Sequence, residues 1–240
     1  MKKILQIIIV LGSLLLADDI LSEVQKNGLT IVNKQGKTIK LERIKSPICT
    51  RDNLTPEALW DDNYASRKVA DICKKTFVTQ VGTLQPMNLG KGIKTVGELE
   101  VLVHIKHAQD TPKEYILVDA RTERWFEQIT IPTSVNIPFN EIAYDKDSEL
   151  HDFENEDKFD EYIEHYKRLF TLLNIKKTTK GLDFSKAKSI ILFCNGSWCS
   201  QSPKAIYKLV NMGYPKEKLL WYRGGLQDWL IYDFTVERKF

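Results

Sequence analysis

Residues 189–205 read SIILFCNGSWCSQSPKA and predict a strand, a loop and a helix in that order. The apolar residues 189–193 are typical of a buried strand, and the polar, glycine-containing residues that follow are typical of a loop. Ser202 can cap the next helix, and Pro203 suits its first position because proline has no N–H to leave unpaired. We therefore expect a helix over residues 202–212.

Cys194 lies where this loop begins, and its position predicts a reactive thiol. A sulfur in such a loop faces the positive end of the helix dipole and several free backbone N–H groups. Both effects stabilise a thiolate and lower the pKa of the thiol, and both would stabilise a persulfide or a bound oxyanion. The alternative is a buried cysteine that simply ends a strand, because cysteine packs like a small hydrophobe. The order of strand, cysteine, loop and capped helix favours the reactive thiol.

Apolar runs on either side of this segment predict an α/β domain over residues 95–240. Strands that alternate with helices imply a mainly parallel sheet with helices on both faces. A helix capped by Thr95 is expected to run through about Ile105. The expected strands are residues 115–118, 134–137, 189–193 and 219–222.

Two charged features of this region predict solvated surface rather than a metal site. Residues 145–161 are acidic and run into a helix ending near Leu173, so we expect an acidic helical insertion near residues 145–175. It contains no Asp-x-Asp-x-Asp-Gly calcium loop. His104 and His107 are three apart on a predicted helix, but no third ligand is evident. A solvated helix face is expected there, with no metal and no cofactor.

Two pairs of segments resemble the signatures of rhodanese-like domains. LVDARTERWF at residues 117–126, followed by IPTSVNIP at 131–138, is similar to the first signature. Cys194 with its helix, followed by WYRGGLQDW at residues 221–229, is similar to the closing half. The resemblance covers roughly residues 95–230, and it implies a rhodanese-like fold for that region.

The resemblance also implies a sulfurtransferase. In this interpretation Cys194 accepts a sulfane sulfur, holds it as a persulfide and passes it to a thiophilic acceptor. Asp119 and Arg121 match the family's Asp-x-Arg motif and would organise the site, although a salt-bridged strand end is an equal alternative. The implied partners are a small sulfur-containing donor and a thiol or cyanide-like acceptor, which can also be a protein. The substrate-binding loop would be Asn195, Gly196, Ser197, Trp198, Cys199, Ser200 and Gln201.

Some residues depart from the family's usual pattern. Many thiosulfate-using members have Arg or Lys in the cysteine loop, whereas residues 195–201 contain neither and the loop is somewhat longer. Ile129 and Thr130 replace the usual Gly-His. The uncharged loop argues against thiosulfate as the natural donor. It also argues against a cysteine phosphatase or arsenate reductase, which presents an Arg at the end of the loop.

Cys199 keeps other functions open. Cys194 and Cys199 could cycle between dithiol and disulfide as a redox module. Against this, side chains of such a loop tend to point outward, which would keep Cys199 away from Cys194. A third alternative is a non-catalytic rhodanese-like binding module, favoured if the Cys194 sulfur is inaccessible. Trp198 is expected as a substrate wall or a lid.

Residues 1–17 predict a secretory signal peptide. Lys2 and Lys3 form a positive start, residues 4–16 are largely apolar, and Ala17 supplies a small residue at the cleavage position. A transmembrane helix needs about 20 apolar residues, and this run is shorter. We expect cleavage near Ala17, export to the periplasm or another extracytoplasmic compartment, and no stable membrane insertion afterwards. An uncleaved anchor is the alternative.

Residues 18–94 form an N-terminal extension without a recognisable family signature. A hairpin of residues 29–32 with 38–41 and a helix over 56–73, capped by Thr55, are expected. Exported proteins usually pair their cysteines, so a Cys49–Cys73 bridge is expected, with two free buried cysteines as the alternative. The net charge of +3 is small, and no basic stretch is interleaved with aromatics, so no nucleic-acid partner is expected.

Overall fold

The computed structural model describes residues 27, 29–32, 38–41, 47–50, 55–60, 69–74, 81–142, 144–232 and 234–238. The expected signal peptide, residues 1–17, lies outside the described residues. Within these ranges, no helix combines the length and the apolar character that crossing a bilayer requires.

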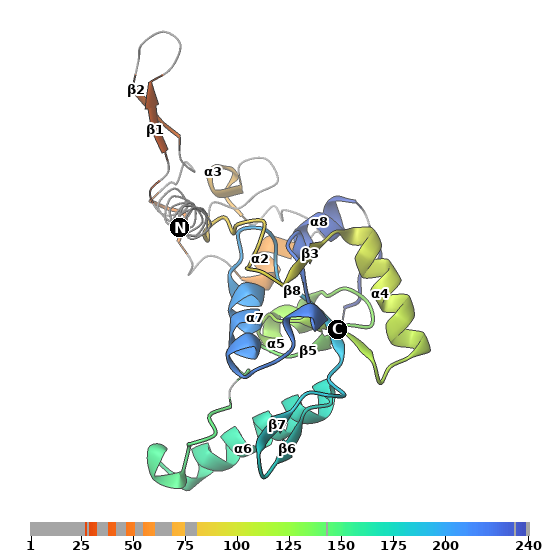
Figure 1. Ribbon diagram of the computed structural model, residues 1–240. Helices are drawn as coiled ribbons and strands as arrows, with labels where there is room; N and C mark the ends of the chain where they lie inside the picture. Colours follow the sequence, from red (N-terminus) through yellow and green to blue (C-terminus); the bar gives the residue numbers. More distant parts are fainter. Residues whose placement is uncertain are drawn as a thin grey trace, which may run out of the picture.

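A five-stranded, all-parallel sheet forms the centre of the fold, with strand order β3-β9-β8-β4-β5. Its strands are β3 (Lys94–Val96), β4 (Tyr115–Asp119), β5 (Val135–Asn136), β8 (Ser189–Phe193) and β9 (Leu219–Tyr222). The helices are α4 (Glu98–Asp110), α5 (Glu123–Gln128), α6 (Glu156–Leu173), α7 (Gln201–Asn211) and α8 (Gly225–Ile231), with 3-10 turns at Leu150–Asp152 and Lys216–Lys218. The expected parallel sheet with helices on both faces is confirmed (Figure 1).

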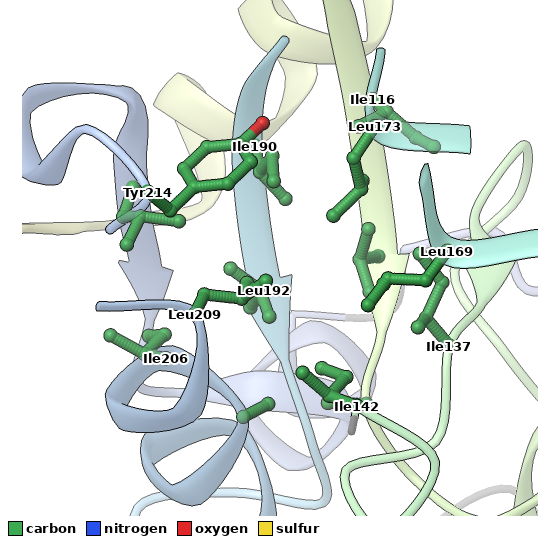
Figure 2. Close-up of a cluster of buried hydrophobic side chains, with 14 of the residues drawn as sticks. Ile116, Ile137, Ile142, Leu169, Leu173, Ile190, Leu192, Ile206, Leu209 and Tyr214 are labelled. Atoms are coloured by element: carbon green, nitrogen blue, oxygen red, sulfur yellow. The ribbon is translucent and has the colours of Figure 1, made fainter. Parts of the chain in front are cut away.

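Alternate residues of β8 face two separate hydrophobic cores, because successive side chains of a strand point to opposite faces. Ile190 and Leu192 pack in the first core, whose helices are α6 and α7 (Figure 2). Ile191 and Phe193 pack in the second core, beneath α4 and α8. The near-continuous apolar run of β8 therefore reflects a central strand that is buried on both faces.

Strands β8 and β9 have the expected bounds, but the start of the domain differs from the prediction. Thr95 does not cap a helix; it lies in edge strand β3, paired with Trp221 of β9. Helix α4 instead begins after Gly97, whose N–H donates to the Glu100 carboxylate at 3.0 Å. Parallel pairing with β9 outweighs the local capping preference of Thr95.

The two histidines of α4 are not both on a solvated face. His104 is buried, and its Nε2–H donates to the Ile116 carbonyl of β4 at 2.9 Å. Burial lowers the pKa of His104. His107 stacks on the Tyr115 ring. The expectation of a solvated face is therefore wrong for His104, which joins the helix to the sheet.

The acidic insertion is helix α6, which begins after the cap Asn155. Its carboxylates face solvent, while Leu169, Phe170 and Leu173 near its end pack in the first core (Figure 2). The short antiparallel hairpin of β6 (Lys176–Thr178) and β7 (Gly181–Asp183) follows the helix. Only the first part of the predicted insertion is solvated surface.

The N-terminal extension contains the expected hairpin but not the expected single helix. Strands β1 (Leu29–Val32) and β2 (Thr38–Leu41) pair antiparallel. Two short helices, α2 (Pro56–Trp60) and α3 (Asp71–Lys74), replace the helix predicted over residues 56–73, of which 61–68 lie outside the described residues. Thr55 caps α2 as expected, with its Oγ1 accepting from the Ala58 N–H at 3.1 Å.

Cys49 and Cys73 form a disulfide in the structure, with Cα atoms 5.3 Å apart. This is the pairing that the cysteine count favoured. The bond closes a segment with a sequence separation of 24 residues. It leaves Cys194 and Cys199 as the free cysteines of the chain.

Candidate active site

Cys194 lies at the carboxyl end of β8, the central strand of the sheet. The backbone N–H groups of Leu226 and Gln227, in α8, donate to the carbonyls of Cys194 and Asn195 at 2.9 and 3.0 Å. Gly225 makes this approach possible, because a Cβ there would lie 2.3 Å from the Cys194 carbonyl oxygen. The start of the loop is thus fixed between the sheet and α8.

Hydrogen-bond donors surround the Cys194 sulfur, and the residue is only 2% exposed. The Ser202 hydroxyl donates to Cys194 Sγ at 3.0 Å, and the Sγ lies 3.4 Å from the Cys199 carbonyl oxygen. Burial by itself raises the pKa of a thiol. Here hydrogen bonds from the Cys199 thiol, the Ser202 hydroxyl and the backbone N–H groups of Ser202 and Gly196 outweigh burial and lower the pKa of Cys194 to about 7.

Ser202 does not cap the helix as the sequence predicted. Helix α7 begins one residue earlier, at Gln201, its N-cap is Ser200, and Pro203 is its third residue. The Ser202 side chain turns inward because Trp221 of β9 donates its indole N–H to the hydroxyl at 3.0 Å. This bond orients the hydroxyl proton toward Cys194. Ser202 therefore belongs to the candidate site, and the capping role predicted from the sequence is wrong.

Cys199 points inward, contrary to the expectation that it would face away from Cys194. It is 5% exposed, and its N–H donates to the Gly196 carbonyl at 2.9 Å, which closes a turn inside the loop. Burial and the hydrogen bond to Cys194 raise the pKa of Cys199. The Cys199 Sγ–H donates to the Gln201 side-chain oxygen at 3.7 Å. Cys199 therefore keeps its proton at a pH at which Cys194 loses its own.

Asp119 and Arg121 form a fully buried salt bridge at the end of β4. The Arg121 guanidinium donates to both Asp119 oxygens, to the Ile129 carbonyl and, at 3.2 Å, to the Asn195 side-chain oxygen. Thr130 adds a hydroxyl bond to Asp119 at 2.7 Å. The pair is thus the salt-bridged strand end that the sequence offered as one alternative, and its guanidinium also contacts the cysteine loop at Asn195.

Trp198 is neither an exposed wall nor a lid. It is 4% exposed, packs in the second core and donates its indole N–H to the Gln227 side chain at 2.7 Å. Of the predicted loop, Asn195, Gly196, Trp198 and Cys199 are buried, and Ser197, Ser200 and Gln201 are half-buried. The loop is mostly an interior structure.

The N-terminal extension contacts the cysteine loop directly, which the sequence did not reveal. Residues 82–86, which we call the strap, run along the loop: the N–H groups of Thr83 and Gln85 donate to the carbonyls of Trp198 and Ser197 at 3.1 and 2.8 Å. The Arg223 guanidinium also donates to the Gln85 carbonyl of the strap at 2.9 Å.

Helix α2 adds another contact from the extension. Its Trp60 is 1% exposed, and the indole N–H donates to the Asn195 side-chain oxygen at 3.1 Å. That oxygen thus accepts from both Trp60 and Arg121. The turn signals of residues 80–94 gave no indication that the strap contacts the loop. The helix expected over residues 56–73 gave no indication that Trp60 does.

A cavity of about 770 Å³ lies at the carboxyl end of β9. Its lining includes Arg223, Glu98 and Asp228, and the Tyr222 hydroxyl donates to Glu98 at 2.9 Å. Burial and the nearby Glu98 raise the pKa of Asp228. In the described part of the chain, no group of His, Cys, Asp and Glu side chains is arranged to hold a metal ion.

Replacing Ser202 by alanine is expected to raise the pKa of Cys194. A hydrogen bond to a charged group is worth about 1.5–3 kcal/mol, which corresponds to roughly one to two pH units. The pH dependence of Cys194 alkylation by iodoacetamide measures the change, and the midpoint of the rate profile should move upward. Ser200→Ala is the matched control, since Ser200 makes no side-chain cap bond. Equal midpoints for both variants would contradict the assignment of Ser202.

Replacing Gly82 by alanine is expected to lift the strap from the loop. Gly82 has φ +87°, and an added Cβ would lie 2.4 Å from the Trp198 carbonyl oxygen. Hydrogen exchange at the amides of Thr83 and Gln85 should become faster. Gly90→Ala is the control for backbone strain alone. Gly90 also has a positive φ, +123°, but an added Cβ there would contact nothing. Unchanged protection in Gly82→Ala would show that the strap does not depend on this close approach.

A family model for the rhodanese-like domain matches residues 101–231. Similar solved structures include the BH2092 protein from Bacillus halodurans, which is 23% identical, with 61% of this chain and 77% of that chain covered and a TM-score of 0.38. A rhodanese with anions from E. coli is 19% identical, with 51% of this chain and 96% of that chain covered and a TM-score of 0.30. A thiosulfate sulfurtransferase from Pseudomonas aeruginosa is 15% identical, with 62% of this chain and 21% of that chain covered and a TM-score of 0.36. No curated protein matches the chain. The family model spans more than half of the sequence, so the chain belongs to the rhodanese-like domain family.

Proposed function

We propose that the protein is a sulfurtransferase in which the Cys194 thiolate accepts a sulfane sulfur. The observation that carries this proposal is the set of donors around a sulfur that is otherwise desolvated. A buried structural cysteine has a raised pKa, whereas the bonds from Ser202, Gly196 and Cys199 lower the pKa of Cys194 to about 7. Donors that stabilise the thiolate also stabilise the anionic persulfide that replaces it.

The reaction has two balanced steps. The Cys194 thiolate attacks the outer sulfur of a donor such as an alkyl thiosulfonate, a Cys194 persulfide anion forms, and an alkyl sulfinate leaves. An acceptor such as cyanide then attacks the outer sulfur of the persulfide. Thiocyanate leaves with that sulfur, and the Cys194 thiolate is restored.

The charges near Cys194 favour a donor with at most one negative charge. Residues 195–201 contain no Lys or Arg. The nearby Arg121 is neutralised by Asp119, with both side chains fully buried. Among the described residues, every buried side-chain nitrogen and oxygen has a hydrogen-bond partner, so no buried side chain offers an unpaired donor to an anion. A thiosulfonate, an organic polysulfide or an organic persulfide fits this environment better than doubly charged thiosulfate.

The burial of Cys194 favours a second candidate function, a non-catalytic binding module. Cys194 is 2% exposed, and the strap fixes the outer side of its loop. A donor reaches the sulfur only when the loop opens. If opening is too rare, the loop acts as a rigid structural element and the surface of the domain carries the function. Reactivity of Cys194 decides between the two candidates.

We also propose that the protein is exported and functions in the periplasm or another extracytoplasmic compartment. The charged and apolar order of residues 1–17 supports this proposal. The Cys49–Cys73 disulfide is compatible with it, because such bonds persist in oxidising compartments.

Replacing Cys194 by serine is expected to abolish thiocyanate formation from an alkyl thiosulfonate and cyanide, since an alcohol cannot form a persulfide. The wild-type protein should produce thiocyanate, with a rate that rises through about pH 7 as the thiolate forms. Full activity in Cys194→Ser would refute the assignment of the nucleophile. A wild-type protein that gains no sulfur, and whose Cys194 alkylates no faster than an ordinary thiol, would instead support the binding module.

Expression in a bacterial host with the native N-terminus tests export. We expect the protein in the periplasmic fraction, with a mature N-terminus close to Asp18. N-terminal sequencing of the purified protein gives the cleavage position. An intact Met1 on protein from the cytoplasmic fraction would exclude the proposal, and an intact Met1 in the membrane fraction would indicate an uncleaved anchor.

A further inference from the structure

We infer that Cys199 is a resolving thiol that converts the Cys194 persulfide into an internal disulfide and releases hydrogen sulfide. The inference rests on the proposed function, because it begins with the persulfide that sulfur transfer creates on Cys194. It adds a second fate for the sulfur: release as free sulfide when no external acceptor is present.

The geometry of the loop brings the two cysteines together in the interior. The turn closed by the Cys199 N–H and the Gly196 carbonyl reverses the chain, and the Cys199 carbonyl oxygen comes within 3.4 Å of Cys194 Sγ. Both residues belong to the second core, at 2% and 5% exposure. The other two cysteines of the chain are bonded to each other, so Cys199 is the thiol of this chain that is free to react with Cys194.

Burial favours the internal thiol over an external acceptor. An external thiol must open a loop that the strap holds through the carbonyls of Ser197 and Trp198. Cys199 is already inside that loop, and a group held next to its target reacts as if at very high concentration. When no acceptor is present, the persulfide that remains after a small donor has left reacts with Cys199; an excess of a small acceptor such as cyanide competes with this step.

The Cys199 thiol supplies the proton that the step requires. The Cys199 Sγ–H donates to the Gln201 side-chain oxygen at 3.7 Å. Burial and the neighbouring Cys194 raise the pKa of Cys199, so Cys199 stays protonated while Cys194 is a thiolate. Persulfide formation moves the negative charge to the outer sulfur. The Cys199 proton can then pass to that outer sulfur, while the Cys199 sulfur bonds to Cys194 Sγ.

The step is balanced in atoms, charge and electrons. The bond between Cys194 Sγ and the outer sulfur breaks, the Cys194–Cys199 disulfide forms, and the outer sulfur leaves as hydrosulfide with the proton from Cys199. The sulfane sulfur is reduced and the two cysteines are oxidised. An external dithiol, such as a reduced dithiol protein, then reduces the disulfide to two thiols and becomes oxidised itself.

A single-turnover experiment tests this sequence with the full chain. The protein, with Cys194 and Cys199 reduced and Cys49–Cys73 intact, receives one equivalent of methanethiosulfonate and no acceptor. That donor leaves as a sulfinate, so it contributes neither sulfide nor a thiol. Sulfide is trapped with monobromobimane, and acid-quenched peptides are analysed by mass spectrometry. Wild-type protein should release a stoichiometric amount of sulfide and carry a Cys194–Cys199 disulfide.

The variants separate this inference from the proposed function. Cys199→Ser should retain one additional sulfur on Cys194 and release no sulfide, and Cys199→Ala should behave in the same way. A dithiol should restore a second turnover in the wild type. If wild type and both Cys199 variants retain the persulfide equally, the resolving role is refuted and sulfur transfer stands. If no protein with Cys194 gains sulfur, the proposed function itself fails.

Discussion

A negatively charged sulfur at Cys194 can exist inside this protein only because hydrogen-bond donors replace the water that burial removes. A buried thiol without such donors stays protonated, since a desolvated charge is costly. The Ser202 hydroxyl, the Cys199 thiol and backbone N–H groups of the loop provide the donors. The lowered pKa of Cys194 therefore depends on the conformation of the loop, and every element that shapes the loop contributes to the chemistry of the sulfur.

Three parts of the chain hold that conformation from different directions. Backbone N–H groups at the start of α8 bind the first two carbonyls of the loop. The Asp119–Arg121 pair reaches the loop through the Asn195 side chain, with all the polar groups involved buried. The strap binds two later carbonyls. Because the extension supplies one of these three supports, it is part of the site and not a separate appendage.

The loop whose donors stabilise the thiolate also encloses it, and this enclosure restricts the partners that the sulfur can meet. An enclosed sulfur favours small donors and favours reaction with a group that is already enclosed. Cys199 is such a group. Its position in the loop is the reason for our proposal that a persulfide on Cys194 is converted into a Cys194–Cys199 disulfide. The neutralised Arg121 and the uncharged loop are the basis of the proposed preference for donors of low charge. The proposed choice of donor and the proposed release of sulfide both rest on this enclosure.

Local patterns in the sequence determined the elements whose causes are local. The apolar run of β8, the helix after it, the position of Cys194 at their junction and the β1–β2 hairpin depend on neighbouring residues, so they could be predicted. The inward orientation of Ser202 and Cys199, the burial of Trp198 and the contacts of the strap could not. Ser202 prefers a cap position by itself, and only the Trp221 indole, 19 residues away, turns its hydroxyl inward. Trp60 meets Asn195 across 135 residues. Tertiary structure decided these features because a hydrogen bond between distant segments forms only once the sheet has brought the segments together.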